Sequence, residues 1–146
     1  MMAGNVIYRG PNDRQPHTVQ KEVAGAYVVG TFVEDTGTTL AQITTALAKR
    51  PLILGNAEYA GQDIATAYTS GDTGVAYVLE PGQVYQARVA AATYAKGAPL
   101  TIAASGRLAA ATAGTVVVAW FDDTAGAYSA GDLADVVIAN SYTVPA

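Results

Sequence analysis

Short apolar runs separated by turn residues restrict this chain to β-structure. From Glu22 onward, runs rich in Val, Ile, Tyr and Thr alternate with clusters of Gly, Pro, Asp and Ser. β-Branched and aromatic residues favour strands, and the turn residues end each run before a helix of ordinary length is complete. Evenly spaced short strands are typical of sandwiches and barrels. The sequence therefore predicts an all-β protein, a compact β-sandwich or β-barrel of short strands.

Turn chemistry predicts how some of these strands pair. Pro81-Gly82 has the backbone preferences of a type II turn, so the runs on either side of it are expected to form a hairpin. Ser105-Gly106 predicts a second tight turn. Gly30 interrupts an apolar run, which indicates a bulge or a close backbone approach. The expected strands are 26–33, 51–54, 74–80, 83–89, 99–103, 107–109, 115–121 and 135–139.

The sequence pattern predicts one structure for residues 115–121 but leaves two structures open for residues 38–49. Residues 115–121 form a continuous apolar run, which suits a central strand buried on both faces. Residues 38–49 place Leu40, Ile43 and Leu47 at helical spacing, but the Thr residues among them lower the helix propensity. A helix and a strand followed by a loop both remain open for this segment.

The N-terminal part has a different composition from the rest. Residues 1–21 are polar, and Gly10-Pro11 and Gln15-Pro16 interrupt any regular element. We expect an extended N-terminal arm over 1–21, followed by a single β domain over 22–146. Such an arm should become ordered when it contacts a partner.

Composition excludes several classes of protein. Among 146 residues, 51% are hydrophobic and only 14% are charged, so disorder driven by charge repulsion is excluded. A net charge of −4 gives no positive field for nucleic acid. No apolar run approaches the ~20 residues that span a bilayer, and the start lacks a signal-peptide core, so no membrane partner is expected. The low proportion of charged residues also suggests that part of the surface contacts a partner.

Catalytic groups are sparse. The chain has no cysteine and one histidine, His17, in the predicted arm. Asp122-Asp123 follows a strand, but adjacent strand residues point to opposite faces, so a charged end to the strand is the favoured interpretation. Asp72 lies in Asp-Thr-Gly, a tripeptide of aspartic-protease loops, but a plain turn is favoured for it. We expect no enzyme, no cofactor and no metal site.

Tyrosine is the prominent aromatic residue. The chain has nine Tyr but only two Phe and one Trp. A tyrosine ring is apolar and its hydroxyl is polar, so the residue suits both the edge of a core and an interface. Exposed tyrosines would also suit a sugar-binding platform, which is the alternative function that this composition leaves open.

One family shares several of these features. The hairpin over residues 94–108, the apolar run 115–121 with Asp122-Asp123, and the strand at 135–138 resemble the C-terminal part of capsid decoration (head decoration or cement) proteins of tailed bacteriophages. The start of the arm, residues 3–11, is similar to the start of such proteins in myovirus-type phages. The resemblance covers most of the chain and consists of turn and strand patterns.

The resemblance implies a structural role. It implies a virion protein on the outer surface of the capsid, made in the host cytoplasm, which bridges subunits of the major capsid protein and stabilises the head. A homo-oligomer, trimer or dimer, would grip several subunits at once. The predicted partner contacts lie in the arm, at Asn5, Ile7, Tyr8, Arg9, Arg14 and His17. The alternatives are a β-sandwich carbohydrate-binding module and, with less support, a hydrolase using Asp72 or Asp122-Asp123.

Overall fold

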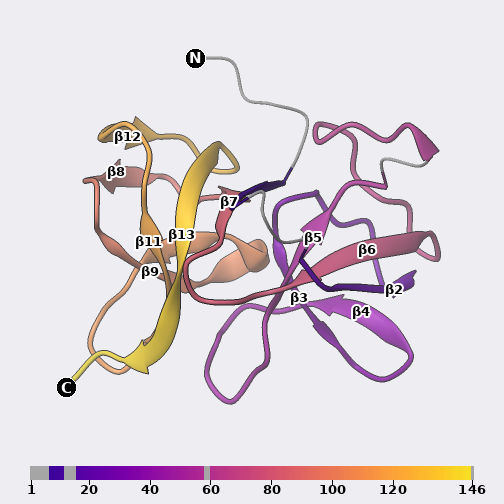
Figure 1. Ribbon diagram of the computed structural model, residues 1–146, viewed down its shortest axis with the longest axis horizontal. Coiled ribbons are helices and arrows are strands. Elements are labelled where there is room, and N and C mark those ends of the chain that lie inside the picture. The colour runs from indigo at the N-terminus through magenta and orange to yellow at the C-terminus, as the bar shows by residue number, and fades with distance from the viewer. Residues whose placement is uncertain (1–6, 12–15, 58–59, 146) are drawn as a thin grey trace.

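The computed structural model describes residues 7–11, 16–57 and 60–145. Their regular structure consists of strands and a 3-10 turn at Ala104–Gly106. Two groups of strands lie side by side, one on each half of the molecule in Figure 1. The predicted all-β class is therefore confirmed.

One group of strands forms a closed barrel. Its strand order is β2-β4-β3-β5-β6, with β2 and β4 parallel and the other neighbours antiparallel. Closure leaves no free strand edge inside this group. The strands are β2 (Thr18–Val23), β3 (Phe32–Asp35), β4 (Thr39–Gln42), β5 (Leu52–Gly55) and β6 (Thr73–Val78).

The other group is a six-stranded sheet of order β1-β7-β13-β11-β9-β10. A parallel bridge between Val89 and Leu108 joins β10 back to the end of β7, so the sheet curls round on itself. Its strands are β1 (Tyr8–Gly10), β7 (Val84–Arg88), β9 (Pro99–Ile102), β10 (Leu108–Ala110), β11 (Val116–Phe121) and β13 (Leu133–Thr143). The short strands β8 (Ala92–Tyr94) and β12 (Gly126–Tyr128) pair with each other beside it.

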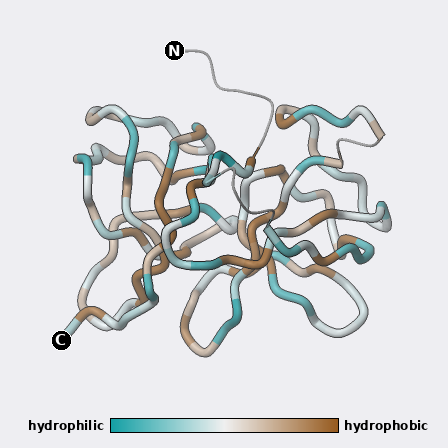
Figure 2. The backbone as a smooth tube through the Cα atoms, in the orientation of Figure 1, coloured by the Kyte–Doolittle hydropathy of each residue, from teal (hydrophilic) through white to brown (hydrophobic). Residues whose placement is uncertain are grey.

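The barrel and the sheet share one hydrophobic core. Fully buried side chains from both groups, among them Phe32, Leu54, Leu100 and Phe121, belong to a single cluster. In Figure 2 much of the most hydrophobic backbone runs through the middle of the molecule. The 3-10 turn also touches the barrel: a Cβ at Gly106 would lie 2.9 Å from the carbonyl oxygen of Phe32. Gly106 therefore permits this close approach.

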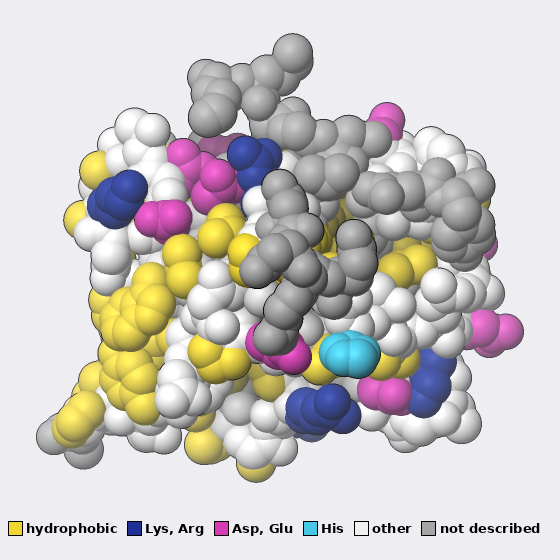
Figure 3. Space-filling view, in the orientation of Figure 1, with side chains coloured by type: hydrophobic (Ala, Val, Ile, Leu, Met, Phe, Trp, Pro, Cys, Tyr) yellow, Lys and Arg dark blue, Asp and Glu magenta, His cyan; other side chains and the backbone are white. Residues whose placement is uncertain are grey.

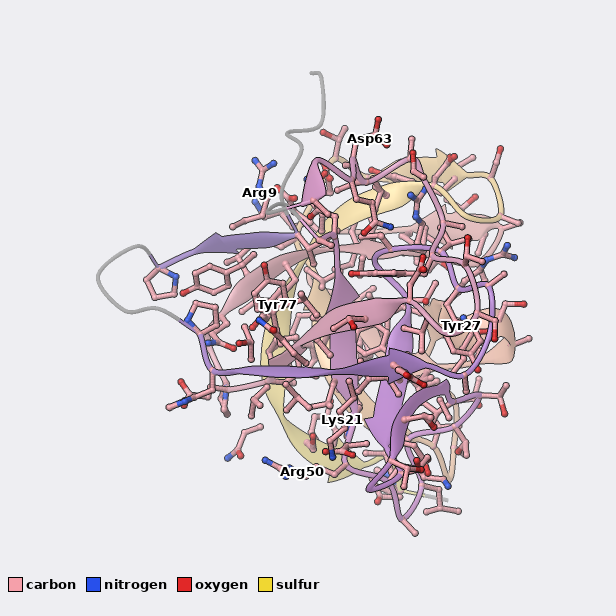
Figure 4. All side chains as sticks on the ribbon, turned by 90° about the vertical axis from the view of Figure 1, so that its right-hand side faces the viewer. Arg9, Lys21, Tyr27, Arg50, Asp63 and Tyr77 are labelled. Carbon is pink, nitrogen blue, oxygen red and sulfur yellow. The ribbon has the colours of Figure 1, made fainter. Side chains whose placement is uncertain are left out.

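Three tyrosine rings fill the joint between the two groups. Tyr85 of β7 is fully buried, with its ring centroid 5.3 Å from that of Tyr8 on β1 and 5.7 Å from that of Tyr77 on β6. Figure 4 shows Tyr77 directed into the interior of the molecule. Tyr85 donates a hydrogen bond of 2.8 Å to Gln83, so its hydroxyl is satisfied although buried. Burial raises the pKa of Tyr85.

The hairpin predicted across Pro81-Gly82 is wrong, although the turn itself forms. Gln83 donates to the carbonyl of Glu80 at 3.2 Å, and Gly82 has a positive φ of 91°. β6 is already paired on both edges, with β2 and β5, so β7 cannot join it. The chain after the turn instead pairs with β13, where Ile138 donates to Gln83 at 2.8 Å. The turn therefore carries the chain from the barrel to the sheet.

Other local predictions fare better. β9 and β10 pair across Ala104–Gly106, and β11 lies between β13 and β9, so the second hairpin and the central strand are confirmed. In the ambiguous segment 38–49, the structure has a strand followed by a loop. The close approach at Gly30 is also confirmed, since a Cβ there would lie 3.3 Å from Cγ of Arg88. Residues 26–31 are loop, however, and β3 begins at Phe32.

The described part of the predicted arm belongs to the folded body. β1 pairs with β7, β2 pairs with β6 and β4, and the side chain of Ile7 has no exposed surface. The polar composition misled the prediction because backbone hydrogen bonds to neighbouring strands hold β1 and β2 in place, and these bonds do not depend on apolar side chains. Residues 1–6 and 12–15 lie outside the described residues.

Ile7→Ala tests this placement. Removing a fully buried side chain leaves a cavity, so the free energy of unfolding should fall by about 2–5 kcal/mol in chemical denaturation. Val28→Ala is the matched control, because Val28 is 38% exposed and its loss should cost less than about 1 kcal/mol. Equal stability of the Ile7→Ala variant and the parent protein would contradict the buried position of Ile7.

Gly55→Ala tests the packing of the tyrosine joint. A methyl group on Gly55 would overlap with Cε2 of Tyr77, whose ring is held by Tyr8 and Tyr85. Overpacking of this kind costs about 1–3 kcal/mol, measurable as a lower melting temperature. In a Tyr77→Leu background the same substitution should cost less, and an undiminished cost would rule out the overlap as its cause.

Candidate partner-binding surface

An apolar row crosses the outer face of the six-stranded sheet. Val84 of β7 is directly opposite Val137 of β13, Val137 is opposite Trp120 of β11, and Trp120 is opposite Pro99 of β9. Directly opposed residues of antiparallel strands share a face. All four side chains are partly exposed, whereas the next residues along β13 and β11, Val136 and Phe121, point into the core. We call Val84, Val137, Trp120 and Pro99 the apolar row.

Tyr142 lies beside Trp120 and widens the apolar row at that point. The two ring centroids are 5.8 Å apart, and Tyr142 is 41% exposed. Figure 3 shows hydrophobic side chains gathered in a band over the β11 and β13 side of the molecule. Trp and Tyr present large rigid areas that lose little entropy on binding, which is why they dominate the energetics of interfaces.

A charged cluster borders the apolar row. Asp135 precedes Val137 by two residues and Asp122 follows Trp120 by two, so these carboxylates fall on the same side of their strands as the row. Arg9 lies 3.5 Å from Asp135, and Lys96 lies 3.6 Å from Asp122. In Figure 3 acidic side chains lie between basic ones along the upper edge of the hydrophobic band. We call Arg9, Asp135, Asp122, Asp123 and Lys96 the charged cluster.

The charged cluster also fixes the end of β11. Asp123 accepts hydrogen bonds from the backbone amides of Thr124, at 2.7 Å, and Asp135, at 2.9 Å. Asp122 donates its own amide to the carbonyl of Asp135 at 2.9 Å. These bonds agree with the predicted role of Asp122-Asp123 as a charged end to the strand. Exposed ion pairs add little stability, so the outer part of the cluster contributes little to the fold.

Asp135 is the member of the cluster with a perturbed pKa. Desolvation raises the pKa of its carboxyl, the nearby charge of Arg9 lowers it, and Asp123 and Asp122 raise it again. The net shift is upward, which means that the ionised form is disfavoured in the folded protein. Its partly buried position beside Val137 accounts for the largest contribution.

The predicted contact residues fall into different environments. Arg9 is exposed enough to meet a partner and lies in the charged cluster, as Figure 4 shows near the start of the chain. Tyr8 packs in the tyrosine joint, and buried Ile7 cannot contact a partner, so the prediction for Ile7 is wrong. His17 is exposed beside the barrel, where its carbonyl accepts from Val78. Asn5 and Arg14 lie outside the described residues.

The Asp-Thr-Gly tripeptide that begins at Asp72 forms a turn. Asp72 accepts a hydrogen bond from the amide of Thr69 at 2.9 Å, and its own amide donates to the carbonyl of Thr69 at 3.0 Å. Asp132 makes the same pair of bonds with Ser129, at 2.8 and 3.1 Å. The predicted turn at Asp72 is therefore confirmed. Within the described ranges, no group of three or more His, Asp or Glu side chains has metal-binding geometry.

Most tyrosines of the described chain belong to the core or its edge. Tyr68, Tyr85 and Tyr94 are buried, and Tyr94 stacks on Phe121 with a centroid distance of 5.2 Å. Among the described tyrosines, only Tyr142 is well exposed. Across residues 7–11, 16–57 and 60–145, no helix is long and apolar enough to cross a membrane.

Comparisons with known proteins add no relative. The scan against protein-family models gives no match, and the search of curated proteins gives none either. The case for function therefore depends on the residues and the geometry of this chain.

The sequence interpretation missed the apolar row because its members come from four separate strands. A partial signal was present: in 83–89 the alternation places Val84 with Gln86 and Arg88, away from the core residues Tyr85 and Ala87. An apolar residue on a polar face is such a signal. The continuous run 115–121 hid the outward position of Trp120, since every residue in it is apolar.

The pH dependence of stability tests the environment of Asp135. Because its pKa is higher in the folded state, the native protein binds more protons than the unfolded chain between the two pKa values. The parent should therefore lose stability relative to Asp135→Asn as the pH rises from about 4 toward 7, measured by denaturation at several pH values. Arg9→Gln should extend this loss to higher pH, and a flat difference would contradict the upward shift.

Proposed function

We propose that this chain is a structural virion protein that decorates the outer surface of a tailed-phage head. In this role it binds major capsid subunits, bridges neighbours and stabilises the assembled shell. A protein that binds the assembled lattice and not the free subunits shifts the equilibrium away from disassembly. No chemical step is needed for this activity.

The observation that carries the proposal is the apolar row with Tyr142 beside it. Two partly exposed valines, Pro99 and a Trp–Tyr pair form a continuous surface across four strands, bordered by ion pairs. An apolar centre with a polar rim is the usual anatomy of a protein interface. Because these residues lie on regular strands, the surface is rigid and loses little entropy when it docks.

The composition and the resemblance support the same role. Only 14% of residues are charged, which leaves wide neutral surfaces for a lattice partner. The segments that resemble decoration proteins, 94–108 and 115–123, include β9, β10 and β11, which lie next to one another in the sheet. We infer a dimer or trimer, because several modest contacts held in one oligomer raise the effective affinity without any one strong contact.

Trp120→Ala tests the proposed capsid contact. Loss of a central aromatic residue should weaken binding to purified empty heads of the corresponding phage at least about tenfold, measured by co-sedimentation at several protein concentrations. Leu47→Ala is the matched control, since Leu47 is apolar and 61% exposed but lies in a barrel loop. It should leave head binding unchanged. Unaltered binding by a folded Trp120→Ala variant would rule out this surface.

Trp120→Ala also distinguishes capsid binding from the alternative function, carbohydrate binding. A carbohydrate-binding module would use the Trp120–Tyr142 pair as a stacking platform for a sugar ring. A glycan array should give no Trp120-dependent binding if the protein decorates heads. Glycan binding that is lost in Trp120→Ala, with no binding to heads, would favour the carbohydrate-binding function instead.

A further inference from the structure

A cavity of about 360 Å³ lies where the barrel meets the sheet. It is separate from the apolar row and has no part in the proposed capsid contact. Arg88 and Arg107 line it from the sheet, Thr31 and Gln42 line it from the barrel, and Ser105 lines it from the 3-10 turn. The cavity therefore joins the two groups of strands.

Arg88 is held firmly at one side of this cavity. Its Nε donates to the carbonyl of Val29 at 2.9 Å, Nη1 to that of Gly131 at 3.0 Å, and Nη2 to that of Ile64 at 2.5 Å. A guanidinium has five N–H donors, so these three bonds leave two of them for another acceptor. The three partners are neutral carbonyls, and they leave the positive charge without a carboxylate.

Arg107 brings a second positive charge to the same place. A Cβ at Gly131 would lie 3.7 Å from Nη2 of Arg107, and the Gly131 carbonyl accepts from Arg88, so both guanidinium groups converge on this residue. No Asp or Glu belongs to the described lining of the cavity. Burial, followed by the charge of Arg107, lowers the pKa of Arg88, while Asp132 opposes this shift. The lining therefore places two cations close together with no acidic side chain of its own, and Asp132 offsets their repulsion only in part.

The neighbouring polar groups are also mainly donors. Gln42 donates through Nε2 to the hydroxyl of Thr31 at 3.2 Å, which leaves the second hydrogen of that amide unused by this bond. The Thr31 hydroxyl in turn donates to the carbonyl of Val28 at 2.7 Å. Ser105 adds an exposed hydroxyl at the rim. Planar guanidinium groups with adjacent amide and hydroxyl donors suit an acceptor with several oxygens.

We propose that this cavity is an oxyanion site, which binds a carboxylate or phosphate group between Arg88 and Arg107. The bound group would neutralise both guanidinium groups and connect the sheet to Gln42 of the barrel. A ligand that binds only the folded protein raises its stability, so occupancy should hold the two groups of strands together more tightly. This proposal does not depend on the proposed function.

Calorimetric titration of the full chain with inorganic phosphate, and separately with succinate, tests the site. We expect saturable binding of at least one of these anions, weakened tenfold or more in Arg107→Gln. Lys96→Gln removes the same charge at an exposed position in the turn between β8 and β9, outside the cavity lining, and it should leave the affinity within twofold of the parent. Arg107→Lys keeps the positive charge but loses the planar guanidinium, which can donate two parallel hydrogen bonds to one oxyanion. The affinity of this variant should therefore fall between those of the parent and Arg107→Gln.

The two anions distinguish the source of the oxyanion. Binding of phosphate alone points to a phosphorylated ligand, and binding of succinate alone points to a carboxylate; either result supports the site if Arg107→Gln abolishes it. Far-ultraviolet circular dichroism should confirm that each variant is folded. No saturable binding of either anion, or an equal loss of affinity in Arg107→Gln and Lys96→Gln, would overturn the proposal.

Discussion

The joint between the barrel and the sheet is the constraint on which the rest of the structure depends. Tyr8, Tyr77 and Tyr85 come from three strands, and their rings meet within 6.3 Å of one another. Burial of aromatic area is the largest favourable contribution that a few side chains can make. Since the strands on either side are short, neither group encloses its apolar side chains without the other. The single shared core follows from this dependence.

The availability of unpaired strand edges then decides which strands can pair. An inner strand has two edges, and β6 and β7 have each filled both: β6 with β2 and β5, and β7 with β1 and β13. The Pro81-Gly82 turn consequently links two separate sheets. The same pairing aligns Val84, Val137, Trp120 and Pro99 in one row. The proposed contact surface is therefore a product of strand register, and a shift by one residue would bury it.

The surface divides into regions with different chemistry. The apolar row is uncharged and partly exposed, whereas the charged cluster beside it carries two exposed ion pairs. On another part of the molecule, Arg88 and Arg107 create a positive cavity in a chain whose net charge is −4. Arg88 also donates hydrogen bonds to the loops that contain Val29, Ile64 and Gly131. The side chain that lines the cavity therefore also connects the sheet to loops of the barrel.

Local chemistry in the sequence determined the β-class, the turns and the central strand. Ser105-Gly106 and the turn at Asp72 act through bonds to near neighbours, and the apolar run at 115–121 suits burial in a central strand. Only the tertiary structure decided the partners of β6 and β7, the burial of Ile7 and the apolar row. Those features depend on pairing between residues far apart in the chain, such as Val84 and Val137. Many such pairings satisfy the same local preferences, and shared burial selects one of them.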